Sequence, residues 1–125
     1  MAGSDEDLAS IVRALEAEKA SIPLRVRLAE RLQAEGEAAL AHEVLDLTVH
    51  DFPLDPAAWT ARADWRAARG DEAGALDDLR HALFAREDDP GALSRTADLC
   101  RRLGRWREAR AAQAALGSKV LSSTG

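Results

Sequence analysis

The fold of this chain is decided by residues 56–89, which read PAAWTARADWRAARGDEAGALDDLRHALFAREDD. The flanking segments 22–55 and 90–123 repeat its spacing at a period of 34 residues. Three columns of the repeat share one phase: Gly36, Gly70 and Gly104; Ala29, Ala63 and Ala97; Ala41, Ala75 and Ala109. Glycine is scarce, with 8 in 125 residues, so its column is the most informative. A fixed period of this size predicts a stacked array of repeats that bury their apolar faces against one another.

Each repeat reads as two helices. Asp55-Pro56 and Asp89-Pro90 place a capping carboxylate before a proline at the first helical position. Ser21, Ile22 and Pro23 form a poorer version of this start before the first repeat. The glycine column stands where each first helix must end, and Asp71 can cap the helix that follows. We therefore predict first helices over about 23–35, 56–69 and 90–103, and second helices over about 38–51, 72–86 and 106–117.

Apolar side chains at helical spacing, mostly leucines, supply the stripes that we expect these helices to bury. They are, in chain order, Leu28 and Leu32; Val44, Leu45 and Leu47; Leu76, Leu79, Ala82 and Leu83; Leu93, Leu99 and Leu103.

Composition indicates one folded, all-α domain. Hydrophobic residues make up 46% and charged residues 31%, with aromatics at 4% and no tyrosine. No apolar run is long enough to span a membrane, and the start of the chain lacks the order of a signal peptide. Cys100 is the single cysteine, which favours a reducing, cytoplasmic location. The preference for arginine and alanine hints at a bacterial source.

Residues 1–21 carry their own apolar stripe, formed by Leu8, Ile11, Ala14 and Leu15. We expect an N-terminal cap helix near 5–19 that covers the first repeat. Two interpretations stay open, because the segment is either the second helix of a degenerate half-repeat or an unrelated capping helix.

The repeat resembles the tetratricopeptide family, whose pattern is W-x2-L-G-x2-Y, A-x3-F and P. Trp59 and Ala63 match its first helix, Ala75-x3-Leu79 its second, and Gly104-Arg105-Trp106-Arg107-Glu108-Ala109 its turn. The resemblance covers residues 22 to about 117 and implies an α-solenoid of three repeats, at 22–55, 56–89 and 90–123. Arg62 and Arg66 depart from it, since they stand where the family has Leu and Tyr. Pentatricopeptide, HEAT and armadillo repeats fit less well, because the period is shorter and no basic stripe follows every unit.

Residues with catalytic or metal-binding chemistry are few, so we expect no enzyme activity, no cofactor and no metal. His42 and Asp46 share a helix face, but two ligands do not make a zinc site. Cys100 falls on a packing face and is expected to be an inert buried thiol. Asp77 and Asp78 are expected to be exposed. We expect Trp59 and Trp106 in the core, and Trp65 either packed or serving as an exposed anchor.

By resemblance, first helices line a concave groove that binds peptides or partner proteins. The predicted groove residues are Arg27, Glu30, Thr60, Asp64, Ser94, Arg95, Asp98, Arg101 and Arg102, together with Gln33 and Ala67. Some family members grip a terminal carboxylate with a Lys, Asn and Arg set, of which this chain has only Arg95. Residues 90–123 hold seven basic and two acidic side chains, whereas 22–55 hold three and seven. This asymmetry favours an acidic partner, although arginines on a solvated helix pair would look the same.

We therefore expect a non-enzymatic interaction module, an adaptor or chaperone-like subunit with a protein or peptide partner and no nucleic acid or membrane insertion. The alternative is a scaffold that stacks through its repeat ends; a catalytic protein has no support in the residues. The last repeat is expected to leave apolar surface exposed near Leu99, Leu103 and Ala114, followed by a tail too short for a helix. Such surface favours a homo-oligomer or a covering partner.

Overall fold

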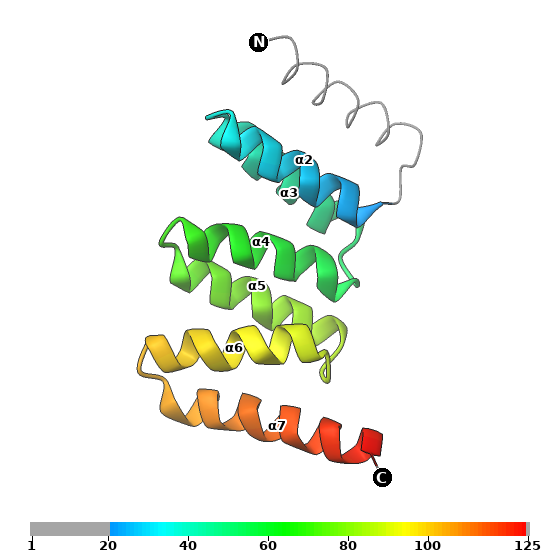
Figure 1. The fold of residues 1–125 in the computed structure, drawn as a ribbon, viewed down its shortest axis with the longest axis vertical. Coiled ribbons are helices and arrows are strands. Elements are labelled where there is room, and N and C mark those ends of the chain that lie inside the picture. Colours follow the sequence, from blue (N-terminus) through cyan, green and yellow to red (C-terminus); the bar gives the residue numbers. More distant parts are fainter. Residues whose placement is uncertain (1–20, 125) are drawn as a thin grey trace. The chain divides into compact units, whose positions relative to one another are not determined.

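The computed structural model describes residues 21–124, and their side chains as far as Ser118. Every regular element in this range is an α-helix (Figure 1). The helices are α2 (Ile22–Ala34), α3 (Ala38–Asp51), α4 (Pro56–Ala68), α5 (Glu72–Ala85), α6 (Pro90–Arg102) and α7 (Trp106–Thr124). The predicted cap helix near 5–19 lies outside the described residues. The chain forms two compact units, one ending at Phe52 and one beginning at Pro53.

The N-terminal unit is one helix pair in its described part. α2 packs against α3, and Leu28, Leu32 and Leu45 are buried between them. An ion pair of 2.8 Å between Arg25 of α2 and Asp51, the last residue of α3, also joins the two helices. Leu47, which the sequence placed on the buried stripe, is instead 58% exposed.

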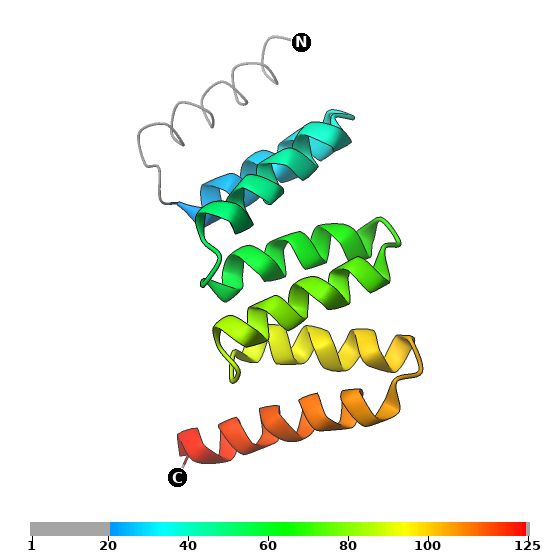
Figure 2. The same cartoon turned by 180° about the vertical axis from the view of Figure 1, so that it is seen from behind.

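The C-terminal unit is a stack of two helix pairs, α4–α5 and α6–α7, joined through contact between α5 and α6 (Figures 1 and 2). α4 also touches α6. The main core cluster draws on all four helices and includes Leu76, Leu79, Leu99 and Cys100. The all-α repeat fold predicted from the period is confirmed by these helix pairs.

The three turns between paired helices have the same geometry. Gly36, Gly70 and Gly104 have φ of 82°, 87° and 74°, a left-handed conformation that glycine adopts without a Cβ clash. In each turn the residue after the glycine donates to a carbonyl five residues back, at 2.8–2.9 Å; the pairs are Glu37–Leu32, Asp71–Arg66 and Arg105–Cys100. This bond satisfies a carbonyl that the helix end leaves free. The glycine column was therefore correctly interpreted.

The predicted helix starts are also confirmed. Ser21, Asp55, Asp71 and Asp89 each accept a hydrogen bond from a backbone N–H of the helix that they precede. These bonds satisfy amides that have no partner inside the helix.

Asp78 corrects the sequence interpretation. It was expected to be exposed with Asp77, yet it is fully buried at the α4–α5 contact, while Asp77 remains exposed. Its carboxylate accepts hydrogen bonds from Arg62 at 2.8 Å and from Arg66 at 3.1 Å. The two arginines that depart from the family pattern are thus explained together. They pair with a carboxylate where the pattern has apolar contacts, because a buried charge is tolerable only when it is paired.

The last repeat also differs from expectation. α7 continues to Thr124, where a helix ending near 117 and a short tail were predicted. Leu99 is buried at 3% exposure, because it belongs to the core shared with α5. Leu103 is 37% exposed. Trp106 is 63% exposed and is not the core residue that the family pattern predicts.

Candidate binding groove

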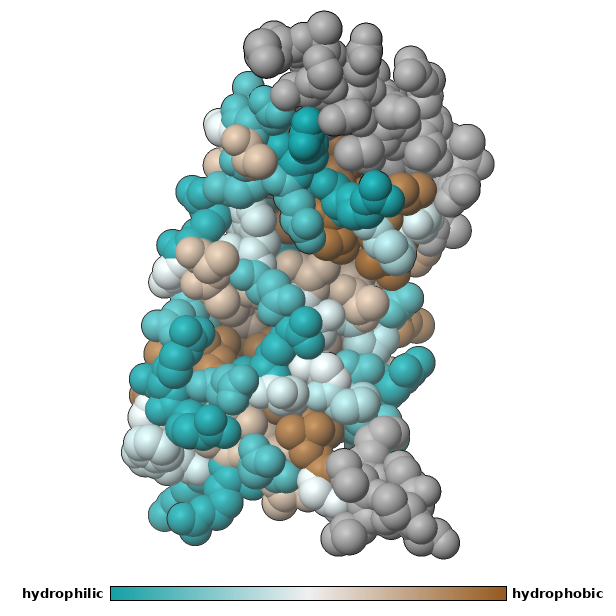
Figure 3. All heavy atoms as spheres, in the orientation of Figure 1, coloured by the Kyte–Doolittle hydropathy of each residue, from teal (hydrophilic) through white to brown (hydrophobic). Residues whose placement is uncertain are grey.

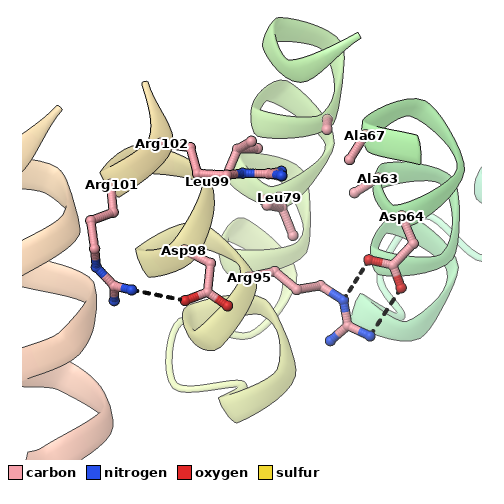
Figure 4. A pocket seen from close by; sticks show the side chains of 10 residues that line it. Ala63, Asp64, Ala67, Leu79, Arg95, Asp98, Leu99, Arg101 and Arg102 are labelled. Carbon is pink, nitrogen blue, oxygen red and sulfur yellow. Dashed lines mark hydrogen bonds and ion pairs between the residues drawn. The ribbon is translucent and has the colours of Figure 1, made fainter. Parts of the chain in front are cut away.

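The C-terminal unit contains a groove of about 560 Å³ between α4, α5 and α6 (Figure 4). Its lining residues are Ala63, Asp64, Ala67, Ala75, Leu79, Arg95, Asp98, Leu99, Arg101 and Arg102. Small and apolar side chains from three helices form the floor, and charged side chains form the rim. Figure 3 shows apolar atoms between hydrophilic side chains on this unit. The groove therefore offers an apolar contact surface with charged groups beside it.

Asp64 and Arg95 close one side of the groove. Arg95 reaches from α6 to Asp64 on α4 (Figure 4), and its Nε and Nη2 atoms donate to the two carboxylate oxygens at 2.7 and 3.0 Å. Its Nη1 atom donates to the Gly91 carbonyl at 3.0 Å. The bond to Asp64 raises the pKa of Arg95 above its ordinary value, although partial burial opposes the shift. This two-point contact fixes the direction of the guanidinium group.

The other arginines of the rim are held more loosely. Arg101 pairs with Asp98 on its own helix at 3.2 Å, and Arg102 pairs with Glu72 of α5 at 3.4 Å. The arginine side chains are 50% and 62% exposed in these pairs. Exposed ion pairs contribute about 0–1 kcal/mol, so a ligand carboxylate can replace either partner at little cost.

The structure brings six of the predicted groove residues together, since the groove is lined by Asp64, Ala67, Arg95, Asp98, Arg101 and Arg102. Thr60 is buried and donates to the Ala57 carbonyl of its own helix at 3.1 Å, and Ser94 is exposed outside the lining. Arg27 and Glu30 are exposed on α2 in the other unit. The described groove is thus a property of the C-terminal unit.

Sequence reasoning missed most of the floor. Ala63 and Ala75 were identified as small packing positions, and Leu79 and Leu99 as core, but none as groove residues. The small columns of the repeat were the available signal. An alanine where helices meet leaves an open space, and the longer side chains around it become the walls of that space.

Two tryptophans pack near the groove helices. Trp59 lies against the core cluster, stacks on His81 with ring centroids 4.3 Å apart, and donates to the Pro53 carbonyl at 2.8 Å. Its predicted packing role is confirmed. Trp65 is half-buried, with the Arg69 guanidinium 4.8 Å from its ring centroid. It is therefore neither a fully buried core residue nor a fully exposed side chain.

The Cys100 thiol lies in an environment that disfavours its reactive form. Cys100 is buried, and its Sγ donates weakly to Glu108 at 4.0 Å. Burial, and secondarily the Glu108 carboxylate, raise the pKa of the thiol, which disfavours the reactive thiolate. Within residues 21–118 no three His, Cys, Asp or Glu side chains are arranged to hold a metal ion. No helix of the described part combines the length and apolar character of a bilayer crossing.

The chain is similar to cellulose synthase operon protein C of Xanthomonas axonopodis pv. citri (strain 306), with 36% identity over 87 residues. The similar region is 70% of this chain but 6% of the length of that relative. No protein-family model matches the chain. The repeat architecture of this chain therefore rests on its own helix pairs.

Proposed function

We propose that this chain is a non-enzymatic interaction module of the tetratricopeptide type, and that the groove of its C-terminal unit holds a segment of a partner protein. The observation that supports this proposal most directly is the groove itself, which has an apolar floor from three helices and arginines on its rim. Concave sites that combine apolar lining with few polar groups are typical of binding sites. A bacterial, cytoplasmic protein is the setting that the composition favours.

The groove chemistry suits a segment that combines an apolar side chain with a carboxylate. The apolar side chain would cover Ala63, Ala67 and Leu79 on the floor. The carboxylate would pair with Arg101 or Arg102, whose present partners are exposed. Because these charges face solvent, binding should weaken as salt is raised.

The test fills the groove at a partly exposed position of its floor. Ala67 is partly exposed on the groove floor, so Ala67→Leu adds bulk where the ligand should lie. Ala68 is exposed on the same helix outside the lining, so Ala68→Leu is the matched control. Wild type and both variants are used as bait in the native cell extract, and captured proteins are identified by mass spectrometry.

The proposal requires proteins that bind wild type and Ala68→Leu but not Ala67→Leu, with equal helicity of all three baits. Peptide arrays from such a protein would then locate the bound segment. An identical set of captured proteins on all three baits would show that this groove is not the binding site.

A further inference from the structure

A second surface lies on α7, away from the groove. Within the described residues the main packing partner of α7 is α6, which it meets through Ala109, Ala112 and Leu116. A different stripe of the helix is exposed, formed at intervals of three and four residues by Trp106, Arg110, Gln113 and Gly117. We call it the α7 stripe. Trp106 is its largest member and is 63% exposed.

The repeat period shows what this stripe corresponds to. A shift of 34 residues places Glu72, Leu76, Leu79 and Leu83 of α5 at the positions of the α7 stripe. That side of α5 meets α6: Glu72 pairs with Arg102, and Leu83 packs on the cluster that holds Leu93 and Ala97. The α7 stripe therefore occupies the face on which the preceding repeat receives another helix.

The chemistry of the two faces differs. Arg110, Gln113 and Gly117 stand where α5 has three leucines, so the expected apolar stacking surface is absent from this stripe. Among described residues neither Arg110 nor the adjacent exposed Arg107 has an ion-pair partner, whereas Arg80 and Arg105 both pair with Glu108. A Cβ at Gly117 would meet nothing within 4 Å, so another helix can approach closely there.

Trp106 supplies the apolar part of the surface. Leu103, 37% exposed, lies just before it at the α6–α7 turn. A tryptophan beside arginines is a composition enriched at binding hot spots. The best complement is a helix with an aliphatic side chain for Trp106 and carboxylates for Arg107 and Arg110.

We propose that the α7 stripe binds an acidic helix of a partner protein, docked on α7 as α6 docks on α5. Charge complementarity selects the acidic partner, since Arg110 on the stripe and Arg107 beside it have no ion-pair partner among the described residues. A two-fold pairing of α7 with α7 of a second copy would bring arginine to arginine, which costs free energy in a contact that excludes water. The surface is independent of the groove and of the function proposed for it.

The probe is a variant of the α6 sequence, because α6 is the helix that occupies the equivalent face of α5. A helix-stapled, fluorescein-labelled peptide of residues 89–104 carries Arg95→Glu, Leu99→Glu, Arg101→Glu and Arg102→Leu. The leucine is meant for Trp106, since Arg102 meets Glu72, the α5 counterpart of Trp106. The unchanged 89–104 peptide is the matched control, and binding to the full chain is measured by fluorescence polarisation.

Three protein variants test the residues. Arg107→Glu with Arg110→Glu reverses the charge on and beside the stripe, and Trp106→Ala removes its aromatic side chain. Arg27→Glu with Arg86→Glu makes the same charge change at exposed sites elsewhere. The acidic peptide should bind wild type and the last variant equally. It should bind at least about tenfold more weakly to the other two, and the charge-reversed stripe should prefer the unchanged, basic peptide. Ala67→Leu should leave this binding unaltered, which separates the stripe from the groove.

Three results would overturn the proposal. No binding of the acidic peptide below about 1 mM, an affinity worth about 4 kcal/mol, overturns it. Equal loss of binding in the remote double variant shows only general charge attraction and also overturns it. Self-association of wild type in sedimentation velocity, abolished by the stripe reversal, would make a second copy the occupant in place of a foreign partner.

Discussion

Arg62 donates three hydrogen bonds to the carboxylate of Asp78, at 2.8, 3.2 and 3.2 Å, and so ties α4 to α5 inside the first helix pair of the C-terminal unit. Arg66 adds a fourth at 3.1 Å. The Arg62 guanidinium also lies 5.3 Å from the centroid of the Trp59 ring. The carboxylate is fully buried and the two arginine side chains are 14% and 20% exposed. The cluster replaces part of the apolar packing between these helices.

Removing Asp78 should be strongly destabilising. Asp78→Ala leaves two largely buried guanidinium groups without their shared partner, and the expected loss is about 3 kcal/mol or more. Urea unfolding followed by circular dichroism measures it. Asp77→Ala, the exposed neighbour, is the control and should change the free energy of unfolding by about 0.5 kcal/mol or less.

Replacing the whole cluster should restore stability. The triple variant Arg62→Leu, Arg66→Tyr and Asp78→Ala supplies the apolar residues of the family pattern and leaves no buried charge. We expect it to be at least as stable as wild type, because apolar replacements of buried ion pairs are often neutral or stabilising by about 1–4 kcal/mol. A triple variant as unstable as Asp78→Ala alone would mean that the ion pairs are not the cause of the loss.

A side chain at the left-handed position of a glycine turn should lower the free energy of unfolding. A Cβ at Gly70 would meet no atom within 4 Å, so the cost of Gly70→Ala is that of its φ of +87° alone, about 1–2 kcal/mol. Gly117 lies inside α7 with equal free space. Gly117→Ala should instead stabilise by about 0.5–1 kcal/mol, since the helix disfavours glycine. Thermal unfolding of both variants compares them, and equal melting temperatures would contradict the turn geometry.

Cys100 should respond to pH in a defined direction. Because burial raises the pKa of its thiol, the folded chain keeps a proton that the unfolded chain loses above the ordinary thiol value of about 8.5. Stability should therefore fall as pH rises through that value, and Cys100→Ala should remove this part of the decline. Alkylation by iodoacetamide near pH 9 should be at least about tenfold slower in the folded chain than in urea. Equal rates would show an accessible thiol.

Asp64 and Arg95 should matter more for binding than for stability. Their side chains are 56% and 42% exposed, so a double-mutant cycle of Asp64→Ala and Arg95→Ala should give a coupling below about 1 kcal/mol. Arg95→Glu should still weaken capture of a groove partner. A coupling free energy well above this limit would show that the pair stabilises the fold and that a ligand carboxylate could not easily replace Asp64.

The groove was predictable only in part. Asp64, Arg95 and Arg102 were found because the family resemblance places first-helix positions on the concave face. The floor was not found, because Ala63, Ala75 and Leu99 look like ordinary packing residues until three helices are brought together. Thr60 occupies an equally plausible position, yet its hydroxyl bonds to its own helix, and a local hydrogen bond of this kind leaves no trace in the period.

The sequence by itself determined where the described helices begin, the turns within each pair and which helices pair, although not the end of α7. These features depend on local chemistry that recurs every 34 residues: aspartate before proline at Pro56 and Pro90, and glycine at Gly36, Gly70 and Gly104. Such signals act within a few residues along the chain, so the linear order contains them.

Only the tertiary structure decided which charged and aromatic side chains are buried and which are exposed. Asp78 looked like its exposed neighbour Asp77, and Arg62 looked like a departure from the family, until packing of α4 on α5 placed them together. Trp106 matched a core position, but the described part of the chain has no helix over that face of α7. Burial depends on which helices meet in the fold. A single sequence does not show which residues far apart along the chain come into contact.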